Sequence, residues 1–104
     1  MTKIVSAAAE FIAAEYGTPE RSAAAHRLWK ALGGAGREQL KQLLRSPTWD
    51  GDVVSKSWRD ELLSAKLAER CCVGGEQGYT TATYPAGALW GLICEDFGYA
   101  RGLK

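Results

Sequence analysis

Residues 55–92 contain the pattern that most restricts the fold, because helical, extended and turn signals follow one another there within one short stretch. A charged amphipathic segment leads into a strand expected at 67–73, and glycines in 74–78 supply the backbone freedom that a tight turn needs. A second strand, rich in tyrosine and threonine, is expected at 79–83. Capped by Thr83 or Tyr84, a last helix is expected from Pro85 to about Phe97. This order predicts a mainly helical domain with a small antiparallel β-hairpin.

The first half of the chain predicts three helices. Apolar residues recur at helical spacing over 3–16, and Gly17 is expected to end that helix in a left-handed conformation. Thr18 and Pro19 then form a cap and first position for a second helix. The glycines of 33–36 are expected to break it, and a third helix follows from 37 to 45 until Pro47 stops it. The residues expected to face the core are Ile4, Ala8, Phe11, Ile12, Tyr16, Ala24, Ala25, Leu28, Trp29, Leu32, Leu40, Leu43 and Leu44.

The segment 55–66 predicts a fourth helix with two different faces. Ser57 with Asp60 has the spacing of a capping box, although Ser55 is an alternative cap. The side expected to be buried carries Trp58, Leu62 and Ala65, whereas another face carries Lys56, Arg59, Leu63 and Lys66. Residues 46–54 are interpreted as a connection that contains a turn at Asp50-Gly51. Whether this connection also forms a short helix is not decided by the sequence.

Length and charge limit the organisation and the partners. The 104 residues fit one domain, interpreted as an N-terminal helical extension (1–36) on a core of 37–98. The formal net charge is only +1, so the chain lacks the overall basic excess of a dedicated nucleic-acid binder. Three cysteines, two of them adjacent, form no plausible disulfide framework and are interpreted as reduced thiols. Without a signal peptide or a long apolar run, a cytoplasmic protein with no membrane partner is expected.

The strings DELLSAKLAER and GYTTATYPAGALW resemble the end of a recognition helix, the wing strands and the closing helix of the winged helix-turn-helix superfamily. The resemblance covers about residues 40–92. It implies a winged-helix-like core with two additional N-terminal helices and a transcription regulator that binds double-stranded DNA. The segment 49–70 is also loosely similar to small uncharacterised phage and prophage proteins. In one respect the chain departs from the superfamily: the preceding helix is expected to end at Arg45, well before Ser55, where a helix-turn-helix has only a short turn.

On this interpretation the fourth helix and the hairpin supply the DNA contacts. Arg59 is the candidate for reading bases, because its planar guanidinium matches guanine edges. The positions expected to contact the phosphate backbone are Ser55, Lys56, Ser57, Lys66 and Arg70. Acidic neighbours of this face, Asp60, Glu61 and Glu69, would repel phosphate and equally favour an ordinary solvated helix surface.

The alternative interpretation is a protein-interaction module, such as a phage-encoded inhibitor or adaptor of a host protein. The near-neutral charge favours this alternative, and Trp49 and Leu63 are its candidate contact residues. Alanine-rich faces on the first two helices would allow them to fold back on the core or to exchange between two copies in a homodimer.

No residue pattern indicates an enzyme, a cofactor or a metal site. His26 is the only histidine and has no triad partner in the sequence, and the pair Asp50 and Asp52 lacks the further oxygen ligands of a calcium loop. The glycines of 33–36 follow a predicted helix and precede Arg37-Glu38, whereas a phosphate-binding loop follows a strand and ends in Lys-Ser or Lys-Thr. We therefore expect a non-enzymatic protein.

Overall fold

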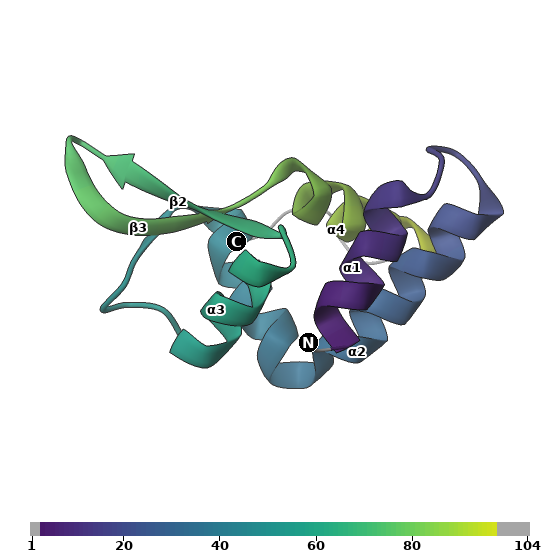
Figure 1. The fold of residues 1–104 in the computed structure, drawn as a ribbon, viewed down its shortest axis with the longest axis horizontal. Coiled ribbons are helices and arrows are strands. Elements are labelled where there is room, and N and C mark those ends of the chain that lie inside the picture. The colour runs from purple at the N-terminus through teal and green to yellow at the C-terminus, as the bar shows by residue number, and fades with distance from the viewer. Residues whose placement is uncertain (1–2, 98–104) are drawn as a thin grey trace.

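The computed structural model describes residues 3–97, with side chains as far as residue 95 (Figure 1). In this part of the chain, four helices pack together, α2 and α3 contact a three-stranded antiparallel sheet, and the β-hairpin extends away from the helices at one end of the molecule. The elements are α1 (Lys3–Ala13), α2 (Pro19–Arg45), β1 (Thr48–Trp49), α3 (Lys56–Ser64), β2 (Ala68–Val73), β3 (Glu76–Ala82) and α4 (Tyr84–Phe97). The predicted mainly helical class with a small antiparallel sheet is confirmed.

Helix α1 buries one apolar stripe against the rest of the protein. Ile4, Ala8 and Phe11 lie in the core, as their spacing predicts. The helix ends at Ala13, before the predicted end at 16, and Ile12 and Tyr16 were wrongly assigned to the core, since they are 40% and 81% exposed. The guanidinium of Arg21 explains this early end, because it donates hydrogen bonds to the carbonyl oxygens of Phe11 (3.2 Å) and Ala14 (3.1 Å).

The second and third predicted helices form one element, α2, with a kink. The Thr18 hydroxyl accepts a hydrogen bond from the Arg21 backbone N–H, so the predicted cap is confirmed. The expected break at 33–36 is wrong in extent: only Gly33 leaves helical geometry, with φ 64°, and the helix resumes immediately. Gly36 lies within the helix, and a β-carbon there would approach the Trp58 ring to 3.1 Å, so glycine permits this contact. The glycines therefore allow a bend and a close helix contact.

The connection 46–54 contains a strand, β1, which the sequence interpretation missed. Thr48 pairs with Thr80 and Trp49 pairs with Tyr79, so β1 lies beside β3 and the strand order is β1-β3-β2. Residues 46–55 form no helix, so the connection contains no short helix before α3. The helix that would precede a recognition helix in a helix-turn-helix is thus replaced by β1 and a turn.

Helix α3 starts from Ser55, whose hydroxyl accepts a hydrogen bond from the Trp58 N–H; Ser57 is therefore not the cap. Leu62 and Ala65 are buried and Trp58 packs partly buried against them, which confirms the predicted core side. The helix ends at Ser64, two residues before the predicted end. Lys66 follows with φ 67°, the left-handed conformation in which chains usually place glycine after a helix. Lys66 consequently does not continue the helical face of Lys56 and Arg59.

The hairpin is longer on its second strand than predicted, because β3 begins at Glu76 and not at 79. Gly74 and Gly75 alone form the turn, and both have positive φ (58° and 84°), as the tight turn that suits the twist of a hairpin requires. The pairing shifts between Cys71 and Val73. Thr48, Ala68 and Thr80 of the sheet are buried, so the face that carries them packs toward the helices.

One hydrophobic cluster joins the N-terminal helices to the rest of the chain. Leu89 and Ile93 of α4 are buried, and the centre of the partly buried Trp90 ring lies 5.6 Å from that of the Trp29 ring of α2. Residues of α1 and of the first half of α2 share this core, so they fold back on it within one chain. Among the described residues, no helix has both the length and the apolar character that crossing a membrane requires.

Candidate functional site

Two glutamines of α2 fix the segment that leads into α3. Gln39 is fully buried, and its side-chain oxygen accepts a hydrogen bond from the Ser55 N–H at 2.8 Å. Its amide donates to the side-chain oxygen of Gln42 at 2.9 Å, and that oxygen also accepts from the Val54 N–H at 3.1 Å. The Gln42 amide donates to the carbonyl of Asp52 at 2.8 Å. This glutamine pair therefore holds 52–55 in place without any helix in the connection.

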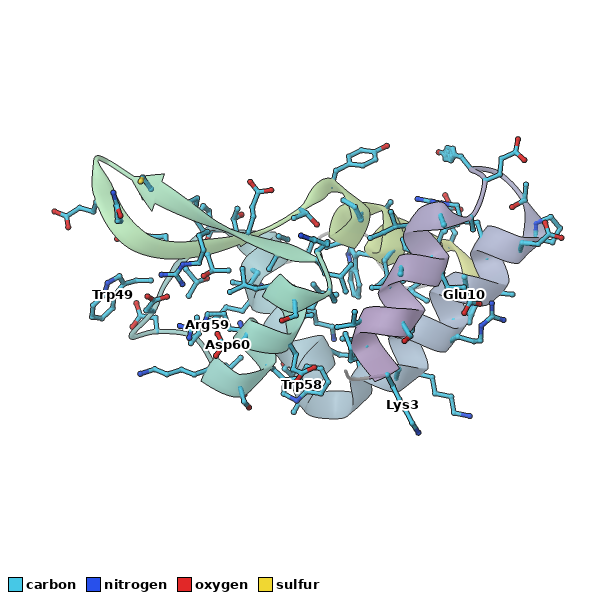
Figure 2. All side chains as sticks on the ribbon, viewed as in Figure 1. Lys3, Glu10, Trp49, Trp58, Arg59 and Asp60 are labelled. Carbon is cyan, nitrogen blue, oxygen red and sulfur yellow. The ribbon has the colours of Figure 1, made fainter. Side chains whose placement is uncertain are left out.

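A group of four charged side chains lies where the 48–52 turn meets α3 and β2. Figure 2 shows Arg59 and Asp60 on the side of α3 that faces the turn carrying Trp49. Asp50 accepts two hydrogen bonds from Arg70, at 2.7 and 2.8 Å, and a third from Arg59 at 3.1 Å. Arg59 also pairs with Asp60 at 2.9 Å, and Arg70 donates to the hydroxyl of Thr80 at 3.0 Å. We call Asp50, Arg59, Asp60 and Arg70 the Asp50 network.

The electrostatics of the Asp50 network favour the charged forms of its members. The hydrogen bond from Arg70 is the main reason that the pKa of Asp50 lies below its ordinary value of 3.8. Desolvation opposes this shift, but the charges of Arg70 and Arg59 act with the hydrogen bonds and the net effect lowers the pKa. The same hydrogen bond raises the pKa of Arg70. The two arginines are therefore held side by side by a carboxylate that stays ionised at neutral pH.

This arrangement uses both arginines that were predicted to contact DNA. The Arg59 side chain is only 14% exposed and both of its ion-pair partners are aspartates, so its donors are directed at carboxylates of the same chain. Arg70 meets Asp50 in a bidentate pair, the geometry by which arginine also binds phosphate. A phosphate or a guanine edge would have to displace Asp50 before either arginine could bind it.

The other predicted contact residues are spread over α3 and its ends. The Ser55 hydroxyl is engaged in capping and lies 3.2 Å from that of Ser57, and Lys56 is exposed in the first turn. Lys66 is exposed beyond the end of the helix. Leu63, a candidate for a protein contact, is partly buried against the core. The structure thus brings Arg59 and Arg70 together, but it does not place Lys66 on the face of Lys56.

Trp49 lies on the outward side of this region, half exposed and well supported. An added β-carbon at Gly51 would meet the indole at 1.9 Å, so the ring lies directly on the Gly51 backbone; Gly78 flanks its nitrogen. Trp49 is paired with Tyr79, and Tyr79 with Cys71, so these side chains share one face of the sheet. Beside them is a hollow between the end of α2 and β1, lined by Gln42, Arg45, Ser46, Pro47, Thr48, Trp49, Asp52 and Tyr79.

The residues considered for catalysis or metal binding do not gather into a site. His26 lies within α2, and the glycines of 33–36 are part of the same helix. Cys94 is buried, whereas Cys71 and Cys72 lie on β2. Across residues 3–97 no three His, Cys, Asp or Glu side chains come together in a manner that could hold a metal ion.

Sequence reasoning missed the roles of Gln39, Gln42 and Asp50. The spacing of Gln39 was a usable signal, because it lies in register with Leu32 and Leu43 on the apolar stripe of α2 and a buried glutamine needs hydrogen-bond partners. Asp50 was interpreted only as a turn residue. Comparisons of the chain with protein-family models, with curated proteins and with solved structures found no match.

Proposed function

We propose that this protein is a non-enzymatic protein-interaction module that binds its partner through the surface formed by Arg45, Pro47, Trp49 and Tyr79. The observation that carries the proposal is the state of Trp49. Its indole is 50% exposed, yet its position is fixed by contact with Gly51 and Gly78. Tryptophan, tyrosine and arginine are the residues that most often supply binding energy at protein interfaces. A rigid aromatic side chain loses little conformational entropy on binding, so the surface is well suited to anchor a partner.

The Asp50 network supports a protein partner over a nucleic acid. Affinity for a duplex comes mainly from cations that neutralise phosphates. Here Arg59 and Arg70 already neutralise Asp50 and Asp60, so a duplex would gain little from them and would be repelled by both carboxylates. The phage-type inhibitor or adaptor considered from the sequence fits this proposal.

Sequence-specific DNA binding is the second candidate function, and the hairpin after α3 favours it. A hairpin directly after α3, followed by a closing helix, is what the winged helix-turn-helix resemblance implies. Lys56 and Ser57 lie exposed in the first turn of α3, where the helix dipole favours a phosphate. This candidate requires that DNA displace Asp50 from Arg59.

Site-specific photo-crosslinking tests the protein-interaction proposal. A photoreactive phenylalanine analogue replaces Trp49 in the full chain, and a matched protein carries it at Lys30, an exposed position of α2. After irradiation in an extract of the natural host, we expect one protein adduct from position 49 that is absent from position 30. In the unlabelled protein, Trp49→Ser should weaken binding of that adduct partner at least about 30-fold, as loss of an interface anchor does.

Three results of the same experiment would overturn the proposal. Identical protein adducts from positions 49 and 30 would show that the contacts are unspecific. Adducts formed at position 49 with nucleic acid alone would favour the DNA candidate. Unchanged affinity of the identified partner for the Trp49→Ser protein would show that it binds elsewhere.

A further inference from the structure

The hollow between the end of α2 and β1 is bordered by two aromatic rings. Trp49 and Tyr79 are partners across β1 and β3, so their side chains leave the same face of the sheet. Within residues 3–97 the two rings make no aromatic contact with each other, and both line the hollow, whose volume is about 320 Å³. Ligand pockets measure about 300–1,000 Å³, so this hollow can hold one or two side chains of a partner segment.

The polar groups around the two rings that lack a partner are mainly donors. Among the described residues, the Trp49 indole N–H and the Tyr79 hydroxyl make no hydrogen bond, and the guanidinium of Arg45 forms no ion pair. Arg45 is exposed at the end of α2. Of the described lining residues only Asp52 carries a carboxylate. The hollow therefore suits a ligand that offers many acceptors and few donors.

The main chain beside the hollow favours recognition through side chains. Strand β1 contains only two residues, and the carbonyl oxygen of Trp49 already accepts a hydrogen bond from the Asp52 N–H at 2.8 Å. The hydroxyl of Thr48 donates to the Ser46 carbonyl at 3.1 Å. A partner strand would find no run of free backbone groups here, which disfavours β-strand addition at this edge. An amphipathic helix needs a longer apolar groove than Pro47 and the two rings supply.

We propose that the partner binds this hollow with a proline-rich segment in the polyproline II conformation, an inference that rests on the protein-interaction function proposed for the same surface. A polyproline II helix has no internal hydrogen bonds, and proline has no N–H, so such a segment presents carbonyl oxygens as acceptors. The indole N–H of Trp49 donates to one of these oxygens while pyrrolidine rings pack on the faces of Trp49 and Tyr79. Proline-rich segments generally dock in grooves lined by aromatic side chains, and they lose little conformational entropy because they are stiff before binding.

Fluorescence anisotropy of a dye-labelled ten-residue peptide of L-proline, titrated with the full chain, tests the inference. We expect a dissociation constant of about 10–500 µM, the range of a weak complex. The same peptide built from D-proline has identical composition, apolar area and carbonyl groups but forms the mirror-image helix, so it should bind at least about 10-fold more weakly. Equal binding of the two enantiomers, or no binding of the L-proline peptide at about 1 mM protein, would overturn the inference.

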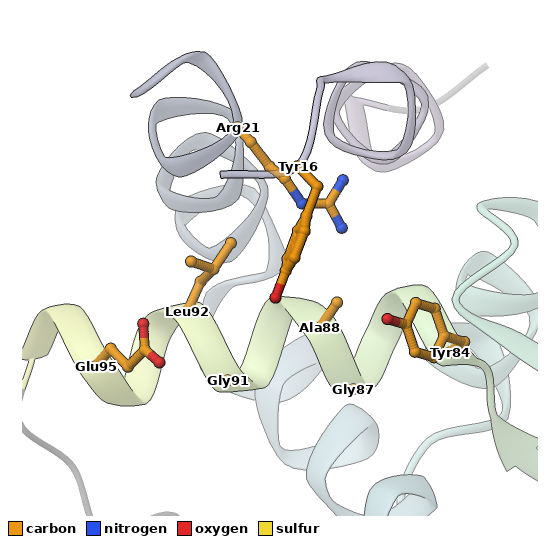
Figure 3. A pocket seen from close by; sticks show the side chains of 8 residues that line it. All are labelled: Tyr16, Arg21, Tyr84, Gly87, Ala88, Gly91, Leu92 and Glu95. Carbon is orange, nitrogen blue, oxygen red and sulfur yellow. The ribbon is translucent and has the colours of Figure 1, made fainter. Parts of the chain in front are cut away.

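Two variants locate the peptide on the chain. Trp49→Phe keeps an aromatic ring and removes the indole N–H, so it should weaken binding of the L-proline peptide about 5- to 10-fold. Figure 3 shows Tyr84 at the first turn of α4, beside a different pocket, where it is 84% exposed. Tyr84→Ala removes this ring and should leave the affinity unchanged.

Nuclear magnetic resonance gives a second readout of the Trp49 contact. In a nitrogen–proton correlation spectrum, the indole signal that Trp49→Phe removes should be the one that the L-proline peptide shifts most. An unshifted Trp49 signal, or an equal loss of affinity in Trp49→Phe and Tyr84→Ala, would contradict the proposed contact.

The crosslinking experiment with the analogue at position 49 separates this inference from the proposed function. A specific protein adduct whose crosslinked peptide, identified by mass spectrometry, contains no pair of prolines would leave the interaction function standing and overturn the proline-rich ligand. Failure to form any specific adduct, with the L-proline peptide still bound at Trp49, would contradict the host protein partner and leave the ligand class in place.

Discussion

Replacing Gln39 by alanine is expected to lower the free energy of unfolding by about 2–3 kcal/mol. The side chain is fully buried, so its removal leaves a cavity. The Ser55 N–H also loses its acceptor, and the side-chain oxygen of Gln42 loses a donor. Because residues 52–55 lead directly into α3, we expect the start of this helix to loosen as well. Urea unfolding gives the free energy, and hydrogen exchange at Val54 and Ser55 reports the local effect.

Two comparisons separate the hydrogen bonds of Gln39 from its volume. Gln39→Met keeps most of the volume and removes both hydrogen bonds, and we expect it to cost about 1–2 kcal/mol. Glu38→Ala changes the exposed neighbouring residue, whose ion pair with Lys41 is on the surface, and should cost less than about 0.5 kcal/mol. A methionine variant as stable as the wild type would contradict the positioning role assigned to the glutamine pair.

Replacing Asp50 by asparagine is expected to destabilise the protein at neutral pH and to have progressively less effect in acid. The variant removes the negative charge that holds Arg59 and Arg70 together and leaves two cations close to each other. Arg59 is largely shielded from solvent, so water compensates its lost partner only in part. The hairpin and α3 should separate more readily, since the network joins them to the turn at Asp50.

The direction of the pH effect follows from the lowered pKa of Asp50. A carboxyl group whose pKa is lower in the folded protein stabilises it above the ordinary value of 3.8, and this contribution is lost as the pH falls through the folded-state pKa. The difference in unfolding free energy between wild type and Asp50→Asn should therefore be constant near neutral pH and shrink below pH 3.8. Asp52→Asn, at an exposed position of the same turn, is the matched control. A difference between wild type and Asp50→Asn that does not change with pH would contradict the assigned charge interaction.

The sequence predicted the helices well where a cap or a buried stripe depends only on residues within one or two helical turns. The Thr18 cap, the Pro19 start and the buried stripe of Ala24, Leu28 and Leu32 all follow from residue type and spacing. Tyr16 is exposed because α1 ends at Ala13, where Arg21 of α2 binds the carbonyl oxygens of Phe11 and Ala14. Such a contact depends on how α1 and α2 pack, which periodicity does not reveal.

The features missed from the sequence all depend on contacts between distant segments. Strand β1 is two residues long and exists because it can pair with β3, about thirty positions later, so no local propensity marks it. Asp50 and Arg70 are 20 residues apart in the chain, so no local pattern links them. The spacing of charges along α3 did not reveal that Asp50 pairs with Arg59. Residue type indicated a cationic face on α3, but the fold brings the Asp50 carboxylate from the preceding turn onto that face.

The most direct test of the central claim is a titration of wild-type protein into a pool of random-sequence DNA duplexes at about 50 mM and about 150 mM salt. The Asp50 network predicts that the wild type binds DNA with a dissociation constant no lower than about 10 µM at the higher salt. Asp50→Asn releases two arginines, so this variant should bind about 10-fold more tightly and its affinity should depend more steeply on salt. The opposite result would be submicromolar binding by the wild type that Arg59→Ala weakens by about 1–3 kcal/mol. That outcome would contradict the claim that the Asp50 network keeps Arg59 and Arg70 from nucleic acid, and it would favour DNA as the ligand over a protein partner.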